Sequence, residues 1–250
     1  MSATVSGAPR IVFFDVGDTL LRADPSWAGV YAGALAEHGI QVDPGALAAA
    51  LVAQPWSTTR QFEANEAAAY EAIKAFDQSV LARLGHRDLP DAVFRSLDEA
   101  FLRPESWLVF PDVVPAIGAL RDAGIRTGII SNWTWRAPEL LDGLGLGSLF
   151  DVVTISARVG WQKPEPAVFR HALDAAGVEP SDAVHVGDSF ETDAVGARSV
   201  GIRPVLIERS IGDPARRPGA VPAGDDVPVI QDLYGLLDLV GVDRPLHAGR

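Results

Sequence analysis

The chain has no cysteine, a single methionine, and only 21 basic residues against 33 acidic ones. The absence of cysteine excludes disulfide bridges, thiolate metal sites and cysteine nucleophiles. The net charge of −12 repels polyanions on average, so we expect no nucleic-acid partner. That balance still allows a local cationic pocket that binds a small anion.

Long apolar runs are also missing, and none approaches the length that crosses a bilayer. Residues 1–9 are small and polar and lack the apolar stretch of a signal peptide. We therefore expect no membrane partner and a cytoplasmic location. The sequence leaves the oligomeric state open.

Short apolar segments of strand type do recur along the chain. They are Ile11–Phe14, Ile125–Ile130, Ala183–Val186 and Arg203–Ile207, with a weaker candidate at Val152–Ile155. Most are continuously apolar, which is typical of parallel strands buried on both faces. Between them lie helical patterns followed by glycine, at Val113–Ala123, Ala167–Ala176 and Asp193–Val200. This alternation predicts an α/β fold with a doubly wound, Rossmann-like parallel sheet.

One long interval, from Asp24 to Arg103, carries almost no strand signal. Its helical segments are Trp27–His38, Pro44–Val52, Gln61–Leu84 and Ala92–Leu102. We predict a helical cap domain over residues 23–104, inserted into a core made of residues 1–22 and 105–250. Nearer the C-terminus, Asp213–Pro228 is predicted to be an exposed loop, and Gln231–Val240 a helix that packs on the sheet.

Polar residues follow the predicted strands at their carboxyl ends. Asp15 follows the first strand, Ser131 the second, and Asp188 and Asp193 follow Ala183–Val186. Each has an ordinary explanation, since Asp and Ser commonly cap turns and helices. The carboxyl ends of parallel strands, however, meet at one edge of a sheet, where ligands bind. We therefore expect these side chains to lie together.

A lysine adds a positive charge to this group. Lys163 lies in the segment Gly160-Trp-Gln-Lys-Pro-Glu-Pro166, although a lysine is ordinarily a solvated surface residue. The clustered carboxylates suit a hard cation such as Mg²⁺, which prefers oxygen ligands. Such a cation and Lys163 together would attract a phosphate.

In this order and spacing, the residues resemble the haloacid dehalogenase-like hydrolase superfamily. The corresponding motifs are Asp15-Val-Gly-Asp-Thr19, Ser131, Lys163 and Gly187-Asp-Ser-Phe-Glu-Thr-Asp193. The match spans residues 10 to 207, and the insertion is similar to the cap of the subfamily with a helical cap after the first strand. The four motifs in order are specific to the superfamily, but they do not specify a substrate.

The resemblance implies a hydrolase in which Asp15 is the nucleophile and forms an aspartyl-phosphate. It also implies Mg²⁺ as the cofactor, bound by Asp15, the backbone carbonyl of Gly17 and Asp188. Asp193 would support the metal.

It further implies that Ser131 and Lys163 hold the transferring phosphoryl oxygens, where positioning and charge neutralisation supply most of the catalysis. Thr19 would order the first loop by hydrogen bonding. The expected partner is a small phosphorylated substrate.

The chain departs from the pattern at Gly17. Typical phosphatases of this family carry an aspartate there, a general acid and base that contributes roughly 10²–10⁴-fold in rate. Asp18 is the next residue, and in an extended chain its side chain would point the opposite way. The leading hypothesis is a Mg²⁺-dependent phosphatase of a small metabolite. The alternatives are a 2-haloacid dehalogenase-like or phosphonate hydrolase, and a weakly active or inactive fold that serves as a binding or regulatory protein.

Two residues bear on those alternatives. The dehalogenases of the superfamily use no metal and usually lack the first aspartate of the fourth motif, whereas this chain keeps Asp188. Phosphonate-cleaving relatives need a Schiff-base lysine in the cap. The only lysine of the predicted cap is Lys74, which lies in an ordinary amphipathic helical pattern.

The substrate-binding candidates are four residues close to these motifs, namely Asn132, Trp133, Arg136 and Trp161. Indole rings and a guanidinium group suit a ring or a second anion. Sealing the interface between cap and core is the alternative role, here and for the cap candidates Trp27, Tyr31, Trp56 and Arg60.

Overall fold

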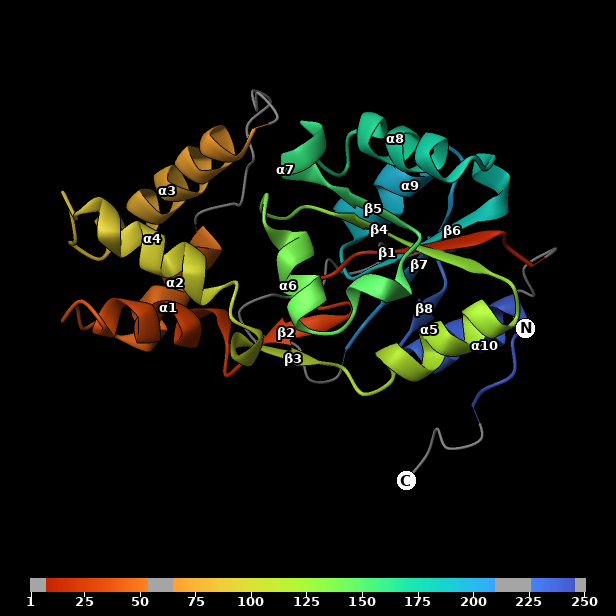
Figure 1. Cartoon of the computed structure of the whole chain (residues 1–250), viewed down its shortest axis with the longest axis horizontal. Coiled ribbons are helices and arrows are strands. Elements are labelled where there is room, and N and C mark those ends of the chain that lie inside the picture. The colour runs from red at the N-terminus through yellow and green to blue at the C-terminus, as the bar shows by residue number, and fades with distance from the viewer. Residues whose placement is uncertain (1–7, 54–64, 210–225, 246–250) are drawn as a thin grey trace.

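The computed structural model describes residues 8–53, 65–209 and 226–245. Its centre is a six-stranded sheet in the order β5-β4-β1-β6-β7-β8, in which every neighbouring pair is parallel (Figure 1). The strands are β1 Ile11–Phe14, β4 Arg126–Ser131, β5 Val152–Ile155, β6 Ala183–Gly187, β7 Arg203–Ile207 and β8 Val229–Ile230. The predicted α/β class is therefore confirmed.

Helices cover both faces of this sheet (Figure 1). On one face lie α5 (Val113–Asp122) and α10 (Leu233–Val240), and on the other lie α8 (Pro166–Ala176) and α9 (Gly196–Arg198). The central strand shows why its sequence is continuously apolar. Val12 and Phe14 join the core under α5 and α10, while Ile11 and Phe13 join the core under α8. Successive side chains of a strand point to opposite faces, and here both faces are buried.

Four helices lie together beside the sheet (Figure 1). They are α1 Trp27–Ala36, α2 Pro44–Ala53, α3 Glu66–Arg83 and α4 Asp91–Ala100. The N-terminus of α1 is capped by Ser26, whose hydroxyl accepts a hydrogen bond from the Gly29 amide at 3.0 Å. These helices fall within the predicted cap range, and the domain limits at residues 23 and 104 stay a prediction. Residues 61–64 of the predicted third helix lie outside the described residues.

The sequence missed several short elements. A two-stranded antiparallel sheet, β2 Leu21–Ala23 with β3 Trp107–Val109, flanks the helical insertion. Strand β8 immediately follows the predicted loop, of which residues 213–225 lie outside the described residues. The remaining short helices are α6 Ala137–Gly143 and α7 Ser156–Val159, with 3-10 turns η1 Pro104–Ser106, η2 Gly147–Leu149 and η3 Pro180–Asp182. Elements this short carry too few residues to show a period.

The helix predicted from Asp193 to Val200 begins earlier and is partly irregular. A π-helical turn, η4 (Phe190–Val195), precedes α9. Ser189 starts it, because its hydroxyl accepts a hydrogen bond from the Thr192 amide at 3.3 Å. The helix therefore starts within the fourth motif itself.

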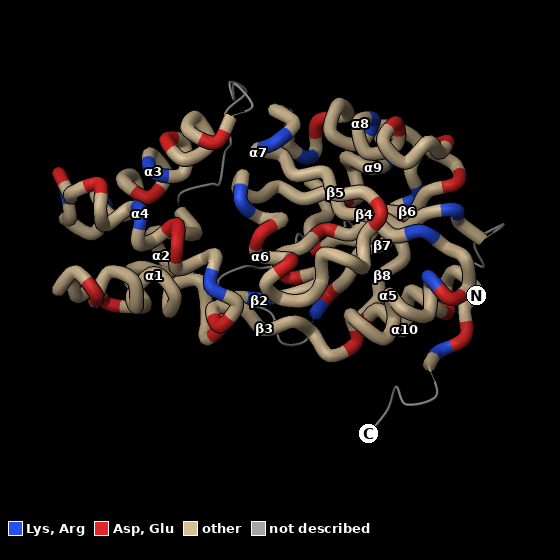
Figure 2. Tube along the Cα trace, in the orientation of Figure 1, with Lys and Arg blue, Asp and Glu red and all other residues tan. Residues whose placement is uncertain are grey.

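Charged residues are distributed over both the helical insertion and the sheet region, as Figure 2 shows. Among the described residues, no helix combines the length and the apolar character that a membrane span requires.

Candidate functional site

The strand order places the polar motif residues side by side. Strand β1 lies between β4 and β6. Asp15, which follows β1, therefore has Ser131, the last residue of β4, on one side and Asp188, which follows β6, on the other. Lys163 approaches from the segment between α7 and α8, which follows the outer strand β5.

The carboxylate of Asp15 is held by two donors. Both the Ser131 hydroxyl and the Lys163 ammonium contact its Oδ1, at 2.8 Å and 2.7 Å. The ammonium also lies 2.5 Å from Oδ1 of Asp193. All four side chains are buried, and Lys163 is only 3% exposed. The lysine is thus an internal charge that bridges two carboxylates, rather than a solvated surface residue.

The charges of this cluster support one another. Burial alone would lower the pKa of Lys163, but Asp15 and Asp193 outweigh it and raise that pKa above its usual value. Burial likewise opposes the charge of Asp193, but Lys163 and His185 hold the pKa of that carboxyl well below its usual range. Lys163 and Asp193 are therefore both charged at neutral pH.

His185, in strand β6, is a member of this cluster that the sequence analysis missed. Its side chain is fully buried, and its Nε2 lies 2.8 Å from Oδ1 of Asp193. Burial lowers the pKa of the imidazole despite the neighbouring carboxylate, so the ring is neutral at pH 7. A carboxylate only accepts hydrogen bonds, so Nε2 carries the proton and donates it. The sequence feature that could have indicated it is a histidine inside an apolar strand, two residues before Gly187 of the fourth motif.

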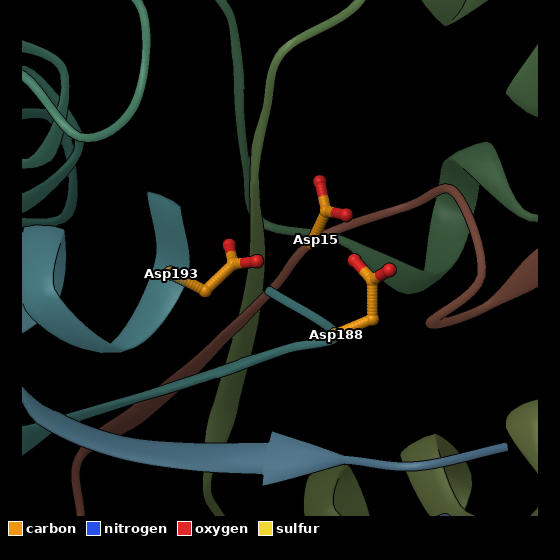
Figure 3. Close-up of side chains that lie close together, drawn as sticks. All are labelled: Asp15, Asp188 and Asp193. Carbon is orange, nitrogen blue, oxygen red and sulfur yellow. The ribbon is translucent and has the colours of Figure 1, made fainter. Parts of the chain in front are cut away.

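Three carboxylates can meet at a metal ion. One oxygen from each of Asp15, Asp188 and Asp193 lies within 4.8 Å of the others, and Figure 3 shows the three side chains converging. An all-oxygen set suits Mg²⁺. The close packing also explains Gly187, since a Cβ there would lie 2.1 Å from the Asp193 carboxyl carbon. The residues present therefore fit a hard divalent cation.

A cavity of about 440 Å³ extends from these residues into the cap. Asp15, Lys163 and Asp188 line its inner end. Side chains from all four cap helices line the rest, including Tyr31, Leu51, Phe76, Asp77 and Leu97. The volume is that of a small-molecule site.

Comparison with known families decides which group of proteins this arrangement represents. The model of the haloacid dehalogenase-like hydrolases matches residues 9–201. The chain belongs to this hydrolase family. The resemblance drawn from the four motifs is thereby confirmed.

Relatives of this hydrolase include phosphatases. It is 31% identical over 236 residues to haloacid dehalogenase-like hydrolase domain-containing protein 3 of Bos taurus, covering 92% of this chain and 94% of that protein. A glyceraldehyde 3-phosphate phosphatase of Methanothermobacter thermautotrophicus is 33% identical over 148 residues, 59% of this chain and 63% of its own length. The crystal structure of a HAD phosphatase from Thermococcus onnurineus has a TM-score of 0.66 and 28% identity, covering 94% of this chain and 100% of that one.

Asn132 has a structural task in the hydrolase. Its side-chain amide donates to the Lys163 carbonyl at 2.9 Å and accepts from the Lys163 amide at 2.7 Å. It lines the cavity, but the oxygen of its side chain and one amide hydrogen are already engaged. Asn132 therefore fixes the backbone that carries the lysine.

Thr19 takes part in the hydrogen bonding of the first loop through its backbone, because its amide donates to the Val16 carbonyl at 3.3 Å. Its hydroxyl is buried and has no hydrogen-bond partner among the described residues. Its carbonyl instead accepts from Nε and Nη2 of Arg209, at 3.1 Å and 2.6 Å. Nη1 of Arg209 contacts Asp112 at 2.7 Å, and the guanidinium lies 4.2 Å from the centre of the Phe110 ring. A distant arginine thus anchors the loop through its backbone.

Gly17 lines the cavity, and Asp18 is not among the described lining residues. Asp18 adopts a left-handed conformation with φ of 55°, and its amide donates to the Leu21 carbonyl at 2.7 Å. The expectation that Asp18 does not replace the missing acid rested on an extended chain. The structure gives a different reason, because a tight turn places this buried residue outside the cavity lining.

The aromatic candidates separate into two groups. Trp133, Trp27 and Tyr31 line the cavity, whereas Arg136 and Trp161 are not among its described lining residues. The indole of Trp161 is exposed. Trp56 and Arg60 lie outside the described residues.

Two further cations are engaged away from the cavity. Arg136 pairs with Glu139 at 2.9 Å and lies 4.0 Å from Asp98. Lys74 lies 2.6 Å from Asp91 and does not line the cavity, so it holds no position from which to form a Schiff base there.

Proposed function

We propose that this protein is a Mg²⁺-dependent phosphomonoester hydrolase that acts on a small phosphorylated metabolite. The observation that carries the proposal is the setting of Asp15. Its carboxylate lies between two donors on one side, Ser131 and Lys163, and a second carboxylate, Asp188, on the other. An anion clamp, a nucleophile and a metal site therefore share the inner end of one cavity.

In the proposed reaction, Ser131 and Lys163 bind and orient the phosphoryl oxygens. A carboxylate oxygen of Asp15 attacks phosphorus, the bond to the leaving oxygen breaks, and the phosphoryl group is carried on Asp15. Water then attacks phosphorus, which releases inorganic phosphate and regenerates the carboxylate. Asp193 keeps Lys163 in place and charged throughout.

The metal would be held by Asp15, the carbonyl of Gly17 and Asp188, with Asp193 beside them. When bound, Mg²⁺ supplies charge neutralisation for the transferring phosphoryl group.

Gly17 limits the proton transfers. No carboxyl is available at this position to protonate the leaving oxygen or to activate the water. We propose that the preferred substrates have leaving groups that depart without strong protonation.

The test is a panel of small phosphate monoesters assayed for phosphate release, with Mg²⁺ and with a chelator. Asp15→Asn removes the nucleophile, and we expect its kcat to fall at least about 10³-fold. Asp174→Asn, on the exposed face of α8, makes the same chemical change away from the site and should keep wild-type rates. Unchanged turnover in Asp15→Asn contradicts the proposal. Binding of a phosphorylated ligand without any turnover favours a binding protein instead.

Carbon–halogen hydrolysis is the second candidate, and Gly17 is the observation that favours it. A dehalogenase forms an ester on the same aspartate and needs no acid at position 17 to protonate a halide leaving group. The Asp15, Asp188 and Asp193 cluster favours the phosphatase. Halide release from a 2-haloacid without added metal would support the dehalogenase, and Mg²⁺-dependent phosphate release without halide release would reject it.

A further inference from the structure

The cap end of the cavity differs chemically from its catalytic end. A phosphoryl group at Asp15, Lys163 and Asp188 fills only the catalytic end of the cavity, and the volume lined by the cap residues remains. That remaining volume must contain the leaving group of a substrate. The residues that line this volume therefore determine which leaving group fits.

Aromatic rings form one wall of this space. Trp27 stacks on Phe101 with ring centres 5.1 Å apart and meets the edge of Trp107 at 5.3 Å. Trp107 lies 5.0 Å from Trp133, and Phe101 lies 5.0 Å from Tyr31. All five residues line the cavity. Such a wall binds the faces of planar apolar groups and also attracts cations through the ring quadrupoles.

A buried carboxyl group lies within this apolar setting. Asp77, on α3, is only 1% exposed and lines the cavity. Its Oδ1 accepts a hydrogen bond from the Tyr31 hydroxyl at 2.5 Å, and its Oδ2 has no hydrogen-bond donor among the described residues. No Lys, Arg or His in the described part of the chain forms an ion pair with it. Burial accordingly raises the pKa of Asp77 to about 7, against the opposing effect of the Tyr31 hydrogen bond.

Among the described residues that line the cavity, acidic side chains outnumber basic ones. Lys163 is the single cation, and its ammonium is already engaged by Asp15 and Asp193. At the cap end the charged groups are Asp77 and Asp98, both carboxyls, and of these Asp98 already lies 4.0 Å from Arg136. A second anionic group on a substrate would meet these carboxyls in a low-dielectric space, whereas an ammonium group would compensate them.

We propose that the cap end of the cavity selects a leaving group with a ring-sized apolar body and a cationic amino group, which Asp77 receives. This inference rests on the proposed phosphatase function and names the substrate class of the same site. The aromatic wall holds the ring, and Oδ2 of Asp77 accepts the ammonium hydrogen bond. Substrates with a second phosphate or a carboxylate in the leaving group are disfavoured.

Three aryl phosphates test the charge preference directly. They are phenyl phosphates with a para aminoethyl, ethyl or carboxyethyl group, so that size and leaving-group chemistry are matched and only the charge differs. For the wild type we expect kcat/KM of the cationic ester to exceed that of the neutral ester by about ten-fold or more, the effect of one favourable ion pair. The anionic ester should be the poorest of the three. Equal values, or a preference for the anion, overturn the proposal.

Variants assign the preference to a residue. Asp77→Asn should remove the advantage of the cationic ester, because the amide carries no negative charge to pair with the ammonium group. Asp174→Asn, outside the cavity, should keep the full preference. Should Asp77→Asn fail to fold, which circular dichroism would reveal, the wild-type ranking decides alone.

A binding measurement separates this inference from the proposed function. Tyramine and 4-ethylphenol carry the cationic and neutral groups without phosphate, and their binding is followed by calorimetry. We expect tyramine to bind the wild type more tightly than 4-ethylphenol does and to lose that advantage in Asp77→Asn. If no ester releases phosphate but this pattern holds, the phosphatase proposal fails and the amine site stands. If the esters are hydrolysed without charge preference, the amine site fails and the phosphatase stands.

Discussion

The two ends of the cavity hold their charges in opposite ways. At the sheet edge, the ammonium of Lys163 bridges the carboxylates of Asp15 and Asp193, and His185 supports Asp193. At the cap end, Asp77 is equally buried but has only a neutral hydroxyl as its partner in the described structure. Asp15 and Asp193 thus share a cation supplied by the chain, whereas Asp77 has none in the described structure.

This difference indicates which kind of group each end of the cavity binds. A compensated cluster keeps its geometry before any substrate arrives, which favours charge stabilisation in a transition state. An uncompensated buried carboxyl lowers stability, and local departures from good packing and charge pairing are typical of functional sites. The cap end is thus a place where a ligand, rather than the protein, supplies the missing charge.

The largest effect is expected from removing the lysine that completes the catalytic end. Lys163→Met leaves Asp15 and Asp193 buried without their cation, so kcat should fall by about 10³-fold or more and stability by about 3 kcal/mol. Phosphate release and urea unfolding measure the two effects. Lys74→Met is the matched control, because its pair with Asp91 is solvent-accessible and contributes little. Equal losses of activity and stability in both variants would show that the buried Lys163 cluster contributes no more than an ordinary surface ion pair.

The free energy of unfolding is expected to depend on pH through Asp77, at the cap end of the cavity. Burial raises the pKa of Asp77 from 3.8 to about 7, so the folded state holds this proton more tightly than the unfolded state. The stabilising contribution of the neutral acid is complete below pH 4 and is lost as the pH rises through 7.

Asp77→Asn cannot ionise and should not suffer this loss. Relative to wild type, its free energy of unfolding should increase by about 3 kcal/mol between pH 4 and pH 8. Denaturant unfolding at both pH values measures the change, and Asp174→Asn should show none of it. A difference that does not vary with pH would mean that Asp77 has a cationic partner after all.

The smallest effect is expected at Gly17, which lines the cavity two residues after Asp15. Gly17→Asp supplies an acid beside the leaving oxygen, so kcat for an alkyl phosphate should rise by about ten-fold or more. An aryl phosphate has a good leaving group and should gain less than about two-fold. Gly17→Asn has a similar shape without the acid, and an equal gain in that variant would show that proton transfer is not what the site lacks.

Much of the core could be predicted because its signals are local. Strands β1, β5 and β7 have the predicted bounds, since buried parallel strands are short, apolar runs that end at turns. Strands β2, β3 and β8 were missed because two or three residues show no period, and partners distant in sequence define them. The π-helical start of η4 depends on hydrogen bonds of Ser189, which no periodicity reveals.

For the site, the sequence indicated the motif residues through their position after strands. It did not indicate the role of His185, because the contact with Asp193 forms only when the residues after the strand fold back onto it. Nor did it single out Asp77, an acid in a helical pattern where solvated acids are the rule. Residue type and spacing carry no information on burial when the covering groups come from other helices.

By itself, therefore, the sequence determined the α/β class, the family and the group of carboxylates, hydroxyl and lysine that meet at the sheet edge. The class and the group follow from periodicity and from the rule that the carboxyl ends of parallel strands lie together, and the family follows from the resemblance of the four motifs. Only the tertiary structure decided that Asp15 and Asp193 share a buried ammonium while Asp77 has no cationic partner among the described residues. The reason is physical, because the pKa and the pairing of a buried group depend on which distant side chains surround it.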